Sequence, residues 1–328
     1  MHPIRTILVA VKDPTASALP AVMKAVQIAR ACGARLELFH AIQASVYADT
    51  PAAYEEALTD LYRNEHRQLL QRLGRIAARI KLHRVEVSCA VALDHPIYDA
   101  IIRRARLIGA DLIVAQRHGG GRGLLRLTDW ELLRHSPLPL LLVAGSRAYH
   151  RPTVLAAVDP THAHAKPAQL DAEILAAGGA LCEALRGRLH AVHAFAPVVM
   201  GSSAKSLAAS VAARLDRIAA AEAAGQVEAL LQKSEIPAAR RHLVGAPPAK
   251  AIAAVARKTH AAIVVMGALS RSGLKRLFIG NTAERAFDEL ASDLLIVKPP
   301  QFQCRVPRES TGPRLRGRPH PHTSWEAH

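Results

Sequence analysis

The chain repeats one pattern of strands and helices twice, and this repeat limits the fold more than any other feature of the sequence. The run Ile7–Val11 is short, apolar and rich in β-branched residues, and a similar run, Val154–Val158, follows about 147 positions later. In each half a helical pattern comes next, and then a second strand-like run that contains a histidine, His40 or His193. The sequence therefore predicts two similar domains rather than one large domain.

Each half is expected to fold as an open, doubly wound α/β domain with a five-stranded parallel sheet. Strands that alternate with helices pair in parallel through right-handed crossovers. Half of the residues are hydrophobic but only 4% are aromatic, which favours helices packed on such a sheet. The predicted domains are residues 1–147 and 148–300. The first helix of each is followed by a glycine, Gly33 or Gly187, suited to a C-terminal cap.

The chain carries a strong positive charge, with a formal net charge of +16. Such a surface attracts polyanions such as nucleic acid. Many arginines lie on predicted helices, however, and charges in that position are also typical of solvated faces. Residues 301–328 contain prolines and arginines without an apolar period, so we expect a disordered basic tail that is a candidate polyanion contact.

Cysteine spacing and hydropathy favour a cytoplasmic protein. The cysteines Cys32, Cys89, Cys182 and Cys304 lie far apart, which argues against a disulfide framework or a zinc site and fits a reducing compartment. No apolar run approaches the ~18–20 residues that a membrane helix needs. The N-terminus enters a strand without the features of a signal peptide. We therefore expect a cytoplasmic location and no transmembrane segment.

The segment Ala262–Pro299 is the strongest candidate for a binding site. It reads as a buried strand, a loop of small residues, a helix and a second buried strand. Gly267 ends the first strand, and Gly280-Asn281-Thr282 begins the helix. Small residues at a strand end, followed by a helix N-terminus, are a common arrangement for binding a phosphate. Asn281 with Glu284 is also an ordinary helix-capping pair, so a purely structural turn stays open.

The order of these features resembles the universal stress protein family. The features are Asp159 after the first strand of the second half, the strand that contains His193, and the spaced small residues from Gly267 to Thr282. The resemblance covers about residues 5–303. It implies a Rossmann-like fold shared with adenine-nucleotide hydrolases, and a role in survival under stress such as DNA damage.

The resemblance also implies a site for ATP or another nucleotide in the second domain. Carried over by position, it places Asp159 and Ala194 near the adenine or ribose. It places Met266 and Gly267 beside the ribose and the α-phosphate. The ligand implied is a small phosphorylated molecule.

The phosphate end of the site departs from the family pattern at two positions. The resemblance places the β- and γ-phosphates on the backbone N–H groups of Gly280, Asn281 and Thr282. Ser270 replaces the second glycine of the family motif, and Asn281 replaces the usual Ser or Thr. A side chain at residue 270 crowds the phosphate path, and it is strained if the turn needs a positive φ. The identity of the phosphorylated ligand therefore stays open.

The first domain is expected not to bind ATP in the family manner. Arg117 and Arg126 stand where the second domain has Gly267 and Gly280, and arginine cannot replace a glycine whose backbone must approach a phosphate. Lys12 stands in the place of Asp159. Within the family, domains commonly pair through their last strands, which here are Leu140–Val143 and Leu294–Val297.

No catalytic set emerges from the sequence, and no metal site is predicted. His40 and His193 lie in the middle of predicted strands, which is typical of structural histidines that are already hydrogen-bonded. We therefore expect a non-catalytic binding protein. A slow ATPase or nucleotide-transfer enzyme, with Thr282 or Asp159 positioning water or Mg²⁺, is one alternative. A module that binds polyanions through the basic surface and the tail is the other.

Overall fold

The computed structural model describes residues 3–43, 52–117, 124–161, 169–195, 206–232, 234, 236–268 and 289–309. The chain forms two compact units. The N-terminal unit is His2–Ala148 together with Gln303–His328, and the C-terminal unit is Tyr149–Phe302. None of the helices that the structure describes is long and apolar enough to cross a membrane.

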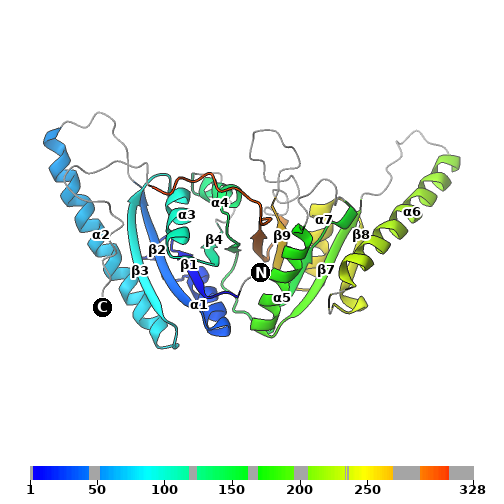
Figure 1. The fold of residues 1–328 in the computed structure, drawn as a ribbon, viewed down its shortest axis with the longest axis horizontal. Helices are drawn as coiled ribbons and strands as arrows, with labels where there is room; N and C mark the ends of the chain where they lie inside the picture. The colour runs from blue at the N-terminus through cyan, green and yellow to red at the C-terminus, as the bar shows by residue number, and fades with distance from the viewer. Residues whose placement is uncertain are drawn as a thin grey trace. The chain divides into compact units, whose positions relative to one another are not determined.

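The N-terminal unit contains a parallel sheet in the order β3-β2-β1-β4-β5, with connecting helices (Figure 1). The central strand β1 is buried along its whole length, which explains its continuous apolar sequence. The elements are β1 Thr6–Ala10, α1 Pro20–Cys32, β2 Arg35–Gln43, α2 Ala52–Lys81, β3 Val87–Asp94, α3 Ile97–Leu107, β4 Leu112–Gln116, α4 Leu124–His135 and β5 Leu140–Val143.

The C-terminal unit repeats this topology in the order β10-β9-β6-β7-β8, again with every pair parallel. Two such sheets confirm the predicted tandem, doubly wound fold. The pairing of the two halves through their last strands stays a prediction. The elements are β6 Thr153–Ala157, α5 Leu170–Leu185, β7 Arg188–Phe195, α6 Ser206–Leu231, η2 Ala238–Arg240, β8 Arg241–Gly245, α7 Pro248–Lys258, β9 Ala261–Gly267 and β10 Asp293–Val297.

The two strand histidines hold equivalent backbone groups in the two units. His40 Nδ1 lies 2.7 Å from the carbonyl oxygen of Val11, and His193 Nδ1 lies 3.1 Å from that of Val158. Each carbonyl belongs to the residue directly after the central strand of its unit. The predicted hydrogen-bonded structural role is therefore confirmed for the Nδ1 atom of both histidines, because this contact fixes the chain where it leaves the sheet.

The two glycines expected to cap the first helices differ in their roles. Gly33 has a φ of 66° and caps α1 in the left-handed conformation, as predicted. The prediction for Gly187 is wrong, because Arg186 caps α5 with a φ of 52°. A Cβ atom at Gly187 would lie only 2.3 Å from the carbonyl oxygen of Pro152. Only glycine fits at position 187, because the backbone there lies too close to the backbone of Pro152 to leave space for a side chain.

The chain after residue 301 is not a disordered tail along its whole length. Val306 is only 5% exposed, and its carbonyl oxygen accepts a hydrogen bond of 3.0 Å from Arg106 Nη1 on α3. The thiol of Cys304 donates to the carbonyl oxygen of His135 over 3.8 Å. The prediction rested on the prolines and arginines of this stretch. Composition does not show that a single buried valine and two hydrogen bonds to backbone carbonyl oxygens hold the stretch on the N-terminal unit. The prediction for the chain beyond residue 309 lies outside the described residues.

Val306 should therefore stabilise the N-terminal unit. Replacing it with aspartate would bury an unpaired carboxylate or release the segment, and we expect a loss of about 2–3 kcal/mol in the free energy of unfolding. Urea titration followed by circular dichroism measures this loss. The exposed Arg308→Ala is the matched control and should change the free energy by less than about 0.5 kcal/mol. Equal stability of both variants would show that the segment contributes nothing.

Candidate functional site

Four of the predicted site residues lie at neighbouring strand ends of the C-terminal unit. Asp159 follows β6, Ala194 lies near the end of β7, and Met266 and Gly267 end β9. The central strand β6 pairs with both neighbours, so that Ala157 stands opposite Val192 on β7 and Met266 on β9. Ligands of open parallel sheets bind at this edge. The other four predicted residues, Ser270, Gly280, Asn281 and Thr282, lie outside the described residues.

Asp159 is held in place by the loop that contains it. Its backbone N–H donates to Asp171 Oδ1 over 3.0 Å, and its own Oδ1 accepts a hydrogen bond of 3.0 Å from Thr161 Oγ1. His193 Nδ1 lies 3.9 Å from the same Oδ1. The carboxylate side chain is 25% exposed. It therefore offers a fixed acceptor to a hydroxyl group of a ligand.

His193 carries a buried nitrogen that no described residue contacts through a hydrogen bond. The residue is 1% exposed, and its Nε2 has no hydrogen-bond partner within the part of the chain that the structure describes. Because the carbonyl oxygen of Val158 can only accept, Nδ1 must carry a hydrogen, and Nε2 is an acceptor whenever the ring is neutral. A buried acceptor without a donor is costly, so it is a reason to expect a further polar group next to this strand end.

Gly267 has a packing reason to be glycine that does not depend on a ligand. A Cβ atom there would lie 2.6 Å from Cδ2 of Leu170, the first residue of α5. Leu170 is itself only 3% exposed. Sequence reasoning missed this contact, because nothing in the motif shows which side chain lies over the glycine.

The contact predicts a measurable coupling between Gly267 and Leu170. Gly267→Ala should lower the free energy of unfolding by about 1–3 kcal/mol, because the new methyl group overpacks the site. In a Leu170→Ala background the same change should cost much less, and a double-mutant cycle measures the difference. Gly179→Ala on α5, where the added methyl meets nothing within 4 Å, is the control for an ordinary glycine-to-alanine change. Additive costs would contradict the packing explanation.

Lys298 is a site residue that sequence reasoning missed. It follows β10, which pairs with β9 so that Val297 stands opposite Gly267. Its ammonium group donates to the carbonyl oxygen of Ala268 over 3.0 Å and lies 4.8 Å from the ring centre of Phe302. Burial lowers the pKa of Lys298 to about 8. The available signal was a single cation directly after an apolar strand, beside the loop expected to hold phosphate.

The lowered pKa of Lys298 makes the stability of the C-terminal unit depend on pH. The folded state loses this proton near pH 8 and the unfolded state near pH 10.5, so stability should rise with pH between these values. One proton corresponds to at most about 1.4 kcal/mol per pH unit. Lys298→Met should remove this part of the slope, as measured by urea titrations from pH 7 to 11. Lys250→Met, at an exposed position on α7, should leave the slope unchanged.

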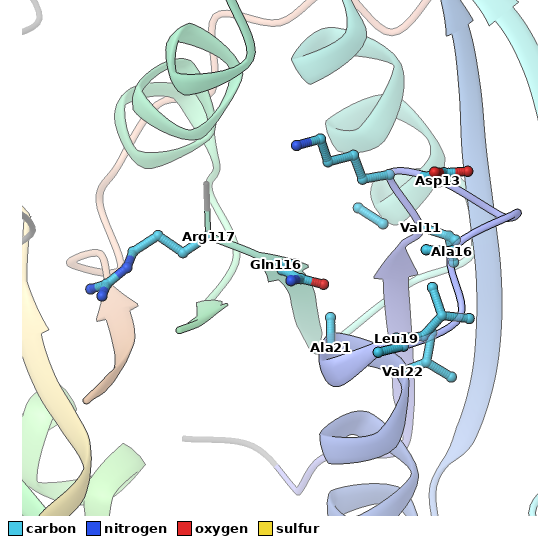
Figure 2. Close-up of a pocket in the computed structure, with 11 residues that line it drawn as sticks. Val11, Asp13, Ala16, Leu19, Ala21, Val22, Gln116 and Arg117 are labelled. Carbon is cyan, nitrogen blue, oxygen red and sulfur yellow. The ribbon is translucent and has the colours of Figure 1, made fainter. Parts of the chain in front are cut away.

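The N-terminal unit has a cavity of about 300 Å³ at the corresponding strand ends (Figure 2). It lies between the chain after β1, the first turn of α1 and the end of β4. Gln116 points towards Leu19, whereas Arg117 extends in the opposite direction. Asp13 accepts hydrogen bonds from the hydroxyl and the N–H group of Thr15, which lower the pKa of the Asp13 carboxyl. That this unit does not bind ATP in the family manner stays a prediction.

The described parts of the two sites contain no cluster of metal ligands. Among the described residues, no three His, Cys, Asp or Glu side chains come close enough together to hold a metal ion. The chemistry that the described groups offer is therefore the binding of polar and anionic groups, through Asp159, His193 and Lys298.

Comparison with known proteins agrees with this architecture. The model of the universal stress protein family matches residues 3–144 and again residues 151–298. The protein belongs to the universal stress protein family, with two domains of that family in tandem.

Relatives of the same tandem type are similar along nearly their whole length. Universal stress protein E of Escherichia coli strain K12 is 27% identical over 311 residues, which cover 91% of this chain and 96% of the relative. The protein of that name from Photorhabdus laumondii is 26% identical over 309 residues, with the same coverage.

Solved structures show the same fold. A protein of unknown function from Pseudomonas aeruginosa PAO1 has a TM-score of 0.64 and 24% identity, over 90% of this chain and 93% of that protein. A universal stress protein from Archaeoglobus fulgidus has a TM-score of 0.58 and 13% identity, over 89% of this chain and 98% of that protein.

Proposed function

We propose that the protein acts in the cytoplasm in the response to stress, such as DNA damage, by binding a nucleotide or another phosphorylated ligand in its C-terminal unit. The observation that carries the proposal is that Asp159, Gly267 and Lys298 lie at the ends of adjoining strands of one sheet. Asp159 is a fixed hydrogen-bond acceptor, Gly267 ends its strand without a side chain, and Lys298 is a buried cation. Together they suit a ligand that has both hydroxyl and phosphate groups.

Each group has a separate task in the proposed complex. Asp159 and the Nε2 atom of His193 accept hydrogen bonds from the sugar or base end of the ligand. Lys298 supplies positive charge near the phosphates, and the family resemblance assigns their direct contacts to Gly280, Asn281 and Thr282. Charge-assisted hydrogen bonds of this kind are about twice as strong as neutral ones. Ser270 and Asn281 depart from the family motif at the phosphate end, which is why we leave the ligand class broader than ATP.

Binding without catalysis fits the hydrogen bonds of Asp159. Thr161 donates to Asp159 Oδ1 and the Asp159 N–H donates to Asp171, so the carboxylate is held as an acceptor for hydroxyl groups of the ligand, and the proposal assigns it no proton transfer. The alternative is that the protein is a slow ATPase, and release of ADP from bound ATP would reveal this activity. The cytoplasmic location is supported by the four cysteines, all of which are free thiols.

Equilibrium dialysis of the full chain against Mg-ATP tests the ligand part of this proposal. We expect binding by the wild type and a loss of at least about tenfold in affinity for Lys298→Met, because a buried charged hydrogen bond is worth about 1.5–3 kcal/mol. Gly280→Arg should abolish binding. Gly225→Arg, at an open position on α6, and Lys12→Gln in the N-terminal unit are matched controls that should bind normally.

The outcomes separate the candidate functions. If ATP does not bind, mass spectrometry of phosphorylated compounds extracted from the purified protein tests the broader ligand class. An empty extract, together with normal survival of cells that carry Gly280→Arg after DNA damage, would remove the ligand from the proposal. Release of ADP by the wild type, lost in Gly280→Arg, would establish the ATPase instead.

A further inference from the structure

A second cavity in the C-terminal unit lies away from the candidate nucleotide site. Its volume is about 360 Å³, and it lies between the edge strand β8 and helix α7. Arg241–Val244 line it from the strand, and Ala254, Val255 and Lys258 line it from the helix. Lys258 ends α7 and Arg241 begins β8, so the charged part of the cavity lies at the amino ends of the strands. The candidate nucleotide site lies at their carboxyl ends.

Two histidines share one hydrogen bond at this cavity. His242, in the cavity lining, and His190 on β7 are stacked with ring centres 5.3 Å apart and planes 4° apart. His190 Nδ1 lies 3.0 Å from His242 Nε2. Because one nitrogen must donate and the other accept, at least one ring is neutral at this contact.

Among the residues that the structure describes, positive charge surrounds the histidine pair without a matching negative charge. Burial lowers the pKa of His190, and His242, Arg240 and Arg188 lower it further. Burial and Lys258 lower the pKa of His242. The side chains of Arg188, Arg240 and Lys258 form no hydrogen bond or ion pair with the described residues.

No acidic residue that the structure describes offsets these cations inside the cavity. The lining contains none, and the nearby carboxylate of Glu228 is bound by Arg241, which also donates to the carbonyl oxygen of Ile236. The C-terminal end of α7 contributes about half a negative charge, which is less than the charge of Lys258 alone. The cavity is therefore left with an excess of positive charge, a condition that favours an anion.

We propose that this cavity binds a small phosphate-bearing anion between His242 and Lys258, and that the histidine pair takes up one proton from solvent as the anion binds. Lys258 and the protonated ring donate to phosphate oxygens, as in other charge-assisted contacts. Val244, Ala254 and Val255 leave room for an apolar or uncharged part of the ligand. This site does not depend on the proposed nucleotide site, because the two share no residue.

Histidine signals in NMR spectra of the full chain test the proposal with inorganic phosphate as the probe. Titrations from pH 5 to 8, at constant ionic strength set with sodium chloride, should show that phosphate raises the pKa values of His190 and His242 by about one unit. Affinity for the phosphate dianion, calculated from its share of total phosphate at each pH, should accordingly rise about tenfold from pH 7.5 to pH 5.5, because one pKa unit corresponds to a factor of ten. His40, in the other unit, should not shift.

Variants distinguish this site from general charge effects. Lys258→Gln should abolish the phosphate effect on His242, and His242→Phe should remove the pH dependence of phosphate binding while keeping a stacked ring. Arg257→Gln, next to Lys258 and exposed, is the matched control and should behave as the wild type. An equal response of Arg257→Gln and Lys258→Gln would overturn the proposal, because it would indicate unspecific attraction.

Two further results would also overturn it. One is a histidine shift that sodium chloride alone reproduces, which would mean simple screening. The other is binding of a single-stranded oligonucleotide, with a steep salt dependence, in the absence of any response to inorganic phosphate or phenyl phosphate. That result would mean that His190, His242 and Lys258 belong to a surface that binds polyanions. Binding of phenyl phosphate more tightly than inorganic phosphate would support a ligand with an apolar group.

Discussion

The candidate site depends on the parallel pairing of β6 with β7 and β9. A parallel register brings the ends of the three strands to one edge, so residues more than 100 positions apart become neighbours. Ala157 faces Val192 on one side and Met266 on the other. The bond between His193 and the carbonyl oxygen of Val158 then sets the direction in which the chain leaves the sheet. Asp159 is placed by these contacts before any ligand is present.

The sequence predicted the fold well because its signals are local and occur twice. A buried strand such as Thr153–Ala157 is apolar wherever it lies, and the repeat shows which strand corresponds to which. Contacts between distant segments have no such signal. Nothing in the sequence shows that Leu170 lies over Gly267, or that Pro152 closes on Gly187. The site could therefore be located from sequence, but the reason for each of its glycines could not.

The two units show how a duplicated site diverges through charge. Their histidines make the same backbone contact, so the scaffold after the central strand is retained in both. The next residue differs, with Lys12 in one unit and Asp159 in the other. In the N-terminal unit this lysine lines an open cavity of about 300 Å³, whereas Asp159 is tied to Thr161. At equivalent backbone positions, the cation Lys12 favours an anionic group of a ligand, whereas the carboxylate Asp159 favours a hydrogen-bond donor.

The C-terminal unit keeps a cation at each end of its sheet, and the two cations differ in their surroundings. Lys298 is buried against Ala268 and Phe302, and burial is what holds its pKa near 8. Lys258 is exposed and lowers the pKa of His242 from the cavity wall. An anion beside Lys298 gains most from the low dielectric of the site, because Coulomb energy rises as water is excluded. An anion beside Lys258 is stabilised instead by protonation of the histidine pair, because the lowered pKa values leave the pair unprotonated when no anion is bound. Binding at this end of the sheet should therefore depend on pH near neutrality.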